Sequence, residues 1–254
     1  MTEVIEFNTE ELPAFVTASI ASGIVIEGAT LLEWTRRNSR QTQQAVMDQV
    51  RLSLEAGEST IQATTRITGG VVAGVEVPGV MSTSRRNAEA LVRTAMAEVV
   101  NKAALQSFQE MNDVVKAIQQ ISTLDSRTSD ICIAYSGQVW DVNTLEPVDP
   151  STLPFNGGPP RHFNCRSRLV PVMKSLEELG IDGTEVPLAA RASMDGQVPG
   201  DITFDGFLKR KSKTFQDNLL GPGRARLWRS GKITLSQLVD FRGNPLTLDQ
   251  LEAL

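Results

Sequence analysis

The chain has 254 residues, a formal net charge of −5 and a hydrophobic fraction of 41%. This length can hold one large domain or two small ones, and the hydrophobic fraction argues against a wholly disordered chain. The acidic balance argues against a surface built throughout to coat nucleic acid, because that task needs a large positive field.

The start of the chain and its cysteine usage favour folding in a reducing cytoplasm. Glu3 and Glu6 lie where a secretory signal would carry basic residues. The longest uncharged stretch, residues 12–26, is shorter than the roughly 20 apolar residues that a membrane-spanning helix needs. Only two cysteines occur, fewer than a secreted protein stapled by disulfides would carry. We therefore expect a protein that folds in a reducing cytoplasm and has no membrane contact.

The first third of the chain is predicted to be helical. Residues 27–54 are rich in Gln, Arg, Leu and Ala, and a glycine soon afterwards can end a helix. Residues 59–67 are predicted to form a short helix, closed by a pair of glycines. Between residues 71 and 81 the composition changes to Gly, Val and Pro, which predicts a hinge or a small hairpin.

The clearest predicted element is a long helix over residues 82–124. This stretch contains no Gly and no Pro, and its apolar residues mostly recur three or four positions apart, as on one face of a helix. The members of this stripe are Val92, Met96, Val99, Ala103, Met111, Val115 and Ile118. We expect this helix to be the spine of a helical domain formed by residues 1–124.

After residue 124 the pattern changes to frequent Pro and Gly between short apolar runs. Residues 138–142 and 168–172 are predicted strands, because each run has β-branched residues between turn signals. Residues 204–220 and 224–230 are predicted helices with a Gly-Pro-Gly break between them. The sequence thus predicts an α+β fold, with a long-helix-dominated N-terminal half and a smaller mixed α+β C-terminal module, residues 125–254, that ends in a helical tail.

The only two cysteines and the only histidine lie in two separate turns of this module. His162 and Cys165 have a His-x-x-Cys spacing that lets both side chains point at one ion, and thiolate and imidazole suit a tetrahedral zinc site. With Cys132 they are the candidate metal ligands. Two other interpretations are open: buried cysteines beside a histidine bonded to the backbone, or a disulfide, which a reducing compartment disfavours.

Three soft ligands leave one position of a zinc site to be filled. Asp125 and Asp130 are candidate fourth ligands, whereas Ser129 and Ser167 are poor ligands for zinc. The cofactor expectation is therefore either none or a structural zinc.

The two turns belong to longer segments with a distinctive order of residues. The notable residues are Asp125, Arg127, Thr128, Cys132 and Gly137 in the first segment, and Gly158, Pro159, Pro160, His162, Cys165, Arg166, Leu169, Val170 and Pro171 in the second. They resemble the signature of the Mu F-like family of phage head-morphogenesis, or minor head, proteins, and Arg93-Thr94 resembles that family's Arg-Thr helix. The resemblance covers roughly the C-terminal two-thirds of the chain. Ser129 and Ser167 stand where many family members have Cys, as the loss or weakening of a metal site would leave them.

This resemblance implies a structural minor head protein of a tailed bacteriophage. Such a protein is expected to bind the portal protein in several copies and to act in head assembly or in genome packaging and ejection. It is expected in the virion, in the head interior or at the portal vertex, where it could touch the major capsid or scaffold protein and DNA. The long amphipathic helix could dock in a groove of a partner. Arginines near the signature could pair with acidic portal residues or DNA phosphates: Arg127, Arg161, Arg166 and Arg168.

Two other classes of function are alternatives. One is a phage-borne, toxin-like enzyme packaged in the head, either a nuclease or an ADP-ribosyltransferase, which needs a base, an electrophilic clamp and a substrate pocket. The single histidine already lies in the Pro-rich turn, and no phosphate-binding loop of the Walker type occurs. The other is a zinc-binding adaptor module. We predict that the chain is not an enzyme and has no catalytic residues.

Overall fold

The computed structural model describes residues 25–26, 29–30, 40–80, 85–183 and 191–254. The chain forms two compact units, one of residues 1–102 with 160–165 and one of residues 103–159 with 166–254. Helices and small antiparallel sheets make up both, so the predicted α+β class is confirmed. The predicted division into residues 1–124 and 125–254 stays a prediction about which parts fold independently.

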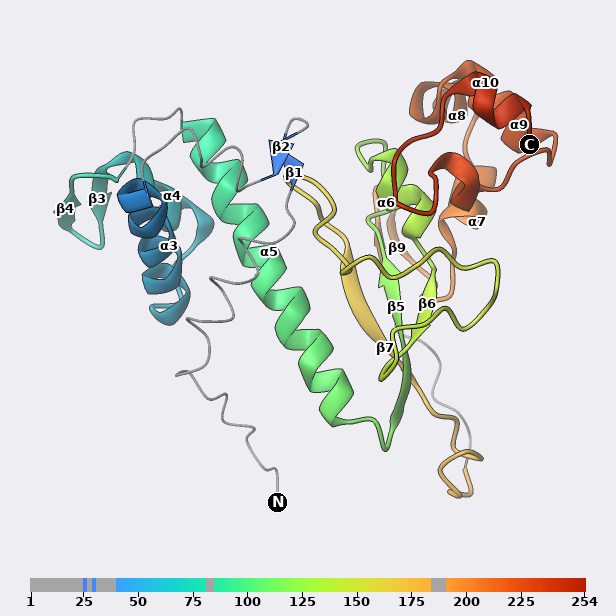
Figure 1. Ribbon diagram of the computed structural model, residues 1–254, viewed down its shortest axis with the longest axis horizontal. Helices are drawn as coiled ribbons and strands as arrows, with labels where there is room; N and C mark the ends of the chain where they lie inside the picture. Colours follow the sequence, from blue (N-terminus) through green and yellow to red (C-terminus); the bar gives the residue numbers. More distant parts are fainter. Residues whose placement is uncertain (1–24, 27–28, 31–39, 81–84, 184–190) are drawn as a thin grey trace. The chain divides into compact units, whose positions relative to one another are not determined.

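Helices dominate the first unit (Figure 1). They are α3, Arg40–Glu55, α4, Thr60–Thr68, and the N-terminal part of α5, Arg85–Glu110. A capping box starts α4, because the Ser59 hydroxyl accepts a hydrogen bond from the Gln62 N–H while the Gln62 side chain accepts one from the Ser59 N–H. The short helix predicted over residues 59–67 is confirmed. The helix predicted over residues 27–54 is confirmed from Arg40 onward, while residues 31–39 lie outside the described residues.

Two small hairpins also belong to this unit. Strands β1, Val25–Ile26, and β2, Ala29–Thr30, pair antiparallel, as do β3, Gly70–Val72, and β4, Val75–Val77. The second pair confirms the small hairpin predicted between residues 71 and 81. The chain on either side of this second hairpin meets at Gly69 and Gly79. Only glycine fits at position 79, because the φ of Gly79 is +75° and a Cβ there would lie 2.6 Å from the Gly69 nitrogen.

The core of the first unit is built from small and aliphatic side chains. Its buried members are Val46, Val50, Ala63, Ile67, Ala88, Leu91, Val92, Ala95 and Val99. More than half of them come from the part of α5 that belongs to this unit, and Val92 and Val99 of the predicted stripe are among them. Docking of the long helix in a partner's groove stays a prediction.

The prediction of one helix over residues 82–124 is wrong in its C-terminal third. Helix α5 ends at Glu110, a turn follows, and strand β5, Val115–Ile121, occupies the rest of the predicted spine. Asn112 and Asp113 are good turn residues, and the Asn112 side chain donates a hydrogen bond to the Gln109 carbonyl at 2.9 Å. The β-branched residues beyond the turn favour extended backbone, but no Gly or Pro marks the change of structure in the sequence.

A three-stranded antiparallel sheet is the centre of the second unit (Figure 1). Its strand order is β6, Val139–Asp141, then β5, then β7, Arg168–Met173. The strands predicted over residues 138–142 and 168–172 are thereby confirmed. Strand β7 contains Pro171, which a strand at the edge of a sheet tolerates because one side of it has no ladder to complete.

Short helices and a hairpin complete the second unit. They are α6, Asp130–Tyr135, β8, Arg191–Ser193, β9, Gly196–Val198, α7, Phe204–Lys209, α8, Lys213–Leu220, α9, Pro222–Arg229, the 3-10 helix η1, Leu235–Leu238, and α10, Leu248–Glu252. The helix predicted over residues 204–220 is two helices, because the Ser212 hydroxyl caps the start of α8. Among the described residues, none of the helices has the length and apolar character that crossing a bilayer requires.

Large aromatic side chains fill the core of this unit. Trp140 is fully buried, stacks on Tyr135 and meets Phe155 edge to face. Its indole N–H donates a hydrogen bond to the Leu153 carbonyl at 2.7 Å. The loop after β6 is thus fixed to the sheet just before the second signature segment begins.

Candidate metal centre

The pairing of β5 with β7 brings the two signature segments to one end of the sheet. Ile121, the last residue of β5, pairs with Arg168, the first residue of β7. The chain that leaves β5 and the chain that enters β7 are therefore side by side, although Ile121 and Arg168 are 47 positions apart in the sequence.

A chain of buried hydroxyl groups joins the two segments next to the strands. The Ser122 hydroxyl donates to the Cys132 carbonyl at 2.7 Å and lies 2.9 Å from the Ser167 hydroxyl. Because a hydroxyl has a single proton, Ser167 is the donor in the second bond. The Ser167 hydroxyl therefore contributes to hydrogen bonding within the unit.

An ion pair joins the segments a second time. Two nitrogens of the Arg166 guanidinium donate to the two oxygens of the Asp125 carboxylate, at 2.5 and 2.9 Å. The same carboxylate accepts hydrogen bonds from the Arg127 N–H and the Thr128 hydroxyl. These donors, Arg166 foremost, lower the pKa of Asp125 to about 2 despite its burial, which acts in the opposite direction.

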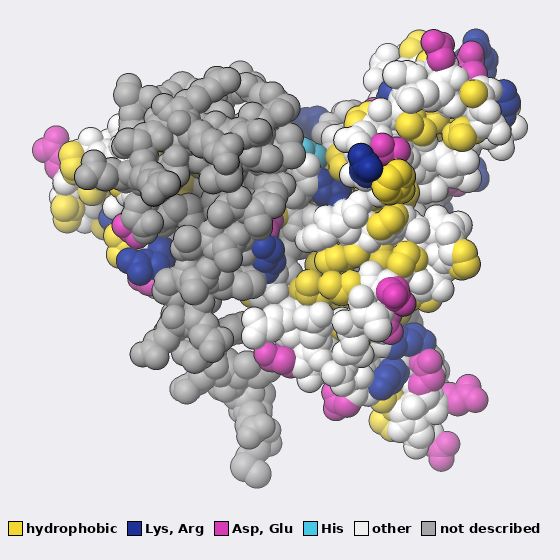
Figure 2. Space-filling model, viewed as in Figure 1, with side chains coloured by type: hydrophobic (Ala, Val, Ile, Leu, Met, Phe, Trp, Pro, Cys, Tyr) yellow, Lys and Arg dark blue, Asp and Glu magenta, His cyan; other side chains and the backbone are white. Residues whose placement is uncertain are grey.

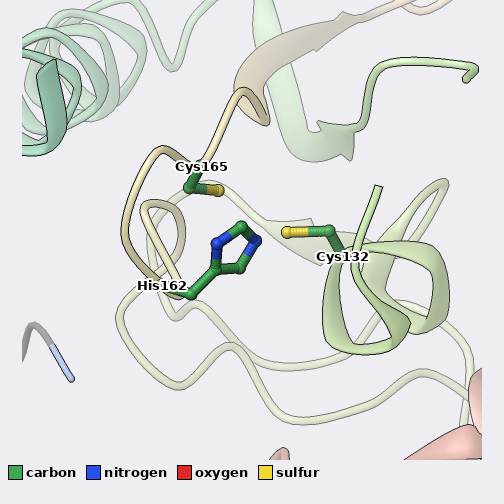
Figure 3. Close-up of side chains that lie close together, drawn as sticks. All are labelled: Cys132, His162 and Cys165. Atoms are coloured by element: carbon green, nitrogen blue, oxygen red, sulfur yellow. The ribbon is translucent and has the colours of Figure 1, made fainter. Parts of the chain in front are cut away.

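The three candidate ligands lie together (Figure 3). Cys132 is on α6, and His162 and Cys165 are on the loop before β7; their Sγ and ring nitrogen atoms all lie within 4.8 Å of one another. Both thiols point toward the imidazole ring, and each cysteine is only 2% exposed. The loop turns back on itself because Asn164 adopts a φ of +55°, a conformation that asparagine tolerates well, and the Cys165 N–H donates to the His162 carbonyl.

The hydrogen bond of the imidazole defines its tautomer. Nδ1 of His162 lies 2.7 Å from the Phe163 carbonyl oxygen. A carbonyl can only accept, so Nδ1 carries the proton and, in the neutral ring, Nε2 carries the lone pair. Histidines that bind metals are usually oriented by such a bond from the other ring nitrogen.

Neither aspartate considered as a fourth ligand joins the cluster. Asp125 is held by Arg166, and the Asp130 carboxylate accepts a hydrogen bond from Arg224 at 2.6 Å. Within the described part of the chain, the Cys, His, Asp and Glu side chains that converge closely enough to hold an ion are Cys132, His162 and Cys165. Ser129 lies at the N-cap of α6.

The cluster is suited to holding structure together and poorly suited to attacking a substrate. A nucleophilic cysteine needs an accessible thiolate, and both thiols are buried. The structure describes Cys132 and Cys165 without a disulfide between them, which differs from the disulfide interpretation. The contact of His162 with a backbone carbonyl fits buried cysteines without metal and fits a zinc site equally well.

Residues outside the two signature segments also support this region. The Thr94 hydroxyl on α5 accepts a hydrogen bond from the Asn164 N–H at 3.0 Å, so one residue of the Arg-Thr motif positions the loop that carries His162 and Cys165. Arg191 donates hydrogen bonds to the carbonyls of Ser122 and Ile202, and burial lowers its pKa. Sequence reasoning missed the contribution of Arg191 and Arg224 to this region, since both act from far along the chain.

A comparison with known protein families identifies the family of the chain. The family model described as Phage Mu protein F like protein matches residues 25–170, which is more than half of the chain and includes the first signature segment and the second as far as Val170. This match indicates a phage head-related protein. The chain belongs to the Phage Mu protein F-like family. No curated protein and no solved structure matches it.

Proposed function

We propose that the protein is a structural minor head protein of a tailed bacteriophage, which binds the portal protein and acts in head assembly or in genome packaging and ejection. Family membership is the observation that carries this proposal, because the match covers more than half of the chain and nearly all of both signature segments. Several copies would surround the portal, in the head interior or at the portal vertex, with the major capsid or scaffold protein as a further neighbour.

The internal contacts of the signature support a role in attachment. Asp125, Thr128, Arg166 and Ser167 are engaged in hydrogen bonds within the unit. Side chains that bond to one another within a unit make it compact and rigid. A rigid surface of this kind suits attachment to another protein. In an enzyme of this size we would expect some of them to face a substrate pocket.

Two signature arginines are exposed and can take part in a contact. The Arg127 side chain is 80% exposed and Arg168 is also exposed, whereas Arg166 is bound to Asp125 and Arg161 is half-buried. Figure 2 shows acidic and basic side chains interspersed on the described part of the viewed face, and not gathered into one broad positive field. We therefore propose that Arg127 and Arg168 contact an acidic surface of the partner, and that any contact with DNA phosphates is weaker.

Sedimentation with the portal of the same phage tests this proposal. The wild-type protein is expected to co-sediment with portal oligomers, and the double substitution Arg127→Glu with Arg168→Glu is expected to weaken binding by about tenfold at low salt. A control double substitution, Lys209→Glu with Arg226→Glu, reverses two other exposed cations and is expected to leave binding unchanged.

Loss of binding by both variants to the same extent would refute the assignment of the two signature arginines. A wild-type protein that never co-sediments with the portal, and instead degrades RNA or modifies acceptor proteins, would overturn the structural role in favour of the enzyme alternative.

A further inference from the structure

We propose that Cys132, His162 and Cys165 bind one zinc ion at a structural site with two sulfur ligands and one nitrogen ligand, and that a single oxygen ligand completes the coordination. This inference is independent of the proposed function, because a metal site can stabilise the fold whichever partner the protein binds.

The convergence of the three side chains is the first reason. The chain contains two cysteines and one histidine in 254 residues, and all three meet with their ligand atoms within 4.8 Å. In a tetrahedral zinc site with Zn–S of about 2.3 Å and Zn–N of about 2.0 Å, ligand atoms lie roughly 3.5–3.8 Å apart. A small inward movement of the side chains would therefore be sufficient to bind the ion.

The orientation of the histidine is the second reason. The bond from Nδ1 to the Phe163 carbonyl leaves Nε2 as the basic nitrogen. Figure 3 shows the imidazole between the two cysteines, with both sulfur atoms directed toward it. The donors that zinc prefers thus face one another, and a backbone bond already fixes the ring, as in many zinc sites.

The surroundings of the cluster indicate which fourth ligand is available. Both aspartates within reach along the chain, Asp125 and Asp130, are bound by arginines, and Ser167 bonds to Ser122. A third thiolate and a second imidazole are excluded, because the chain has no other cysteine and no other histidine. The remaining ligand is then an oxygen, which makes this site more open to ligand exchange than a site with four thiolate or imidazole ligands.

Metal content is the first test. Untagged protein purified without chelator is expected to contain about one zinc per chain by mass spectrometry. Loss of an outer-shell partner usually lowers zinc affinity about 10–100-fold, so Cys165→Ser or His162→Ala, which removes a ligand itself, is expected to lower it by more than about 100-fold. As a matched control, Asp130→Asn changes a nearby group outside the cluster and is expected to keep about one zinc per chain.

Cobalt substitution of the wild-type protein keeps the proposal testable even if a ligand variant does not fold. Cobalt-loaded protein is expected to show thiolate-to-cobalt charge transfer and the visible bands of a tetrahedral ion. X-ray absorption of the zinc form is expected to give two sulfur neighbours at about 2.3 Å and two lighter neighbours at about 2.0–2.2 Å.

Wild-type protein that contains no zinc, and gives no charge-transfer band with added cobalt, would overturn the inference. So would isolation of the protein with Cys132 and Cys165 joined in a disulfide, or an X-ray absorption spectrum with oxygen neighbours only. Metal-free protein that still binds the portal would refute this site alone, while zinc-loaded protein that does not bind the portal would refute the proposed function alone.

Discussion

The two units of the molecule are stabilised by different kinds of side chain. The core of the second unit is built around large aromatic rings, with Trp140 fully buried and hydrogen-bonded. The core of the first unit is built from Val, Ala, Leu and Ile. Its buried polar side chains largely bond to their own helix, as Thr94 does to the Ala90 carbonyl and Asn101 to the Ala97 carbonyl.

This difference indicates how strictly each core defines the positions of its side chains. Small residues let helices approach closely, but they impose few directional contacts and can relax after a substitution. Aromatic rings with fixed polar partners define one arrangement and relax poorly. The signature segments lie mostly in the second unit, where a displaced side chain is expected to lower the stability of the fold.

The largest expected effect is therefore in the aromatic core. Trp140→Ala is expected to lower the free energy of unfolding by about 3–5 kcal/mol, because it leaves a cavity and removes the bond to the Leu153 carbonyl. Leu91→Ala, in the first unit, is expected to cost about 2 kcal/mol, the low end for such a change, because small neighbours can move inward. Denaturant unfolding followed by circular dichroism compares the two, and equal costs would contradict the contrast between the cores.

The ion pair between the signature segments is expected to have the next largest effect. Asp125→Asn is expected to cost about 2 kcal/mol, because it leaves the partly buried Arg166 guanidinium without its carboxylate. In a double-mutant cycle with Arg166→Gln, the coupling energy is expected to exceed about 1 kcal/mol. The control cycle uses Glu89 and Arg93 on α5, an exposed pair four residues apart, for which about 0.3–0.5 kcal/mol is expected. Similar coupling energies in the two cycles would show that the signature pair is an ordinary surface contact.

The pH dependence of stability tests the same carboxylate without a change of core packing. The folded-state pKa of Asp125, about 2, lies below the ordinary value of 3.8, so the unfolded chain takes up the proton first. The stabilisation is complete well above pH 4 and is lost as the pH falls from about 4 toward 2; the shift corresponds to about 2 kcal/mol. In chelator, which removes any contribution of metal, the difference in stability between wild type and Asp125→Asn is expected to shrink over that range. A difference that stays constant down to pH 2 would contradict the assignment.

The smallest expected effect concerns two adjacent glycines. Gly157 and Gly158 both have positive φ, but a Cβ at Gly157 would meet nothing within 4 Å, whereas one at Gly158 would lie 3.1 Å from the Phe155 ring. Both substitutions by alanine strain the backbone by about 1 kcal/mol, and Gly158→Ala is expected to cost about 1 kcal/mol more because the ring must move. Thermal unfolding measures the difference in stability between the two variants. Equal costs would mean that the Phe155 ring moves aside without loss of stability.

The sequence predicted the fold class, four of the nine strands that the structure describes and the set of residues that meet at the site. Periodicity and turn signals gave the strands β6 and β7, and the Gly-Val composition predicted the hairpin β3–β4. The single histidine and the two cysteines were evident as a set, because soft metal-ligating side chains are rare in this chain and all of them fall in two turns.

Other features could not be predicted, for physical reasons. The end of α5 is marked only by Asn112 and Asp113, whose turn preference was weaker evidence than the run of apolar residues around them. The partners of Asp125 and Asp130 are arginines 41 and 94 residues away, and sequence spacing gives no indication of such contacts. The hydroxyl bond from Ser167 to Ser122 depends on the register of β5 and β7, which the hydrophobic pattern of the two strands does not define.

The most direct test of the central claim is the location of the protein in intact phage particles by cryo-electron microscopy. We predict density for its three-stranded sheet and helix α5 in the head, at the portal vertex, in contact with the portal protein. Particles without the protein, or with the protein only at sites remote from the portal, would contradict the account.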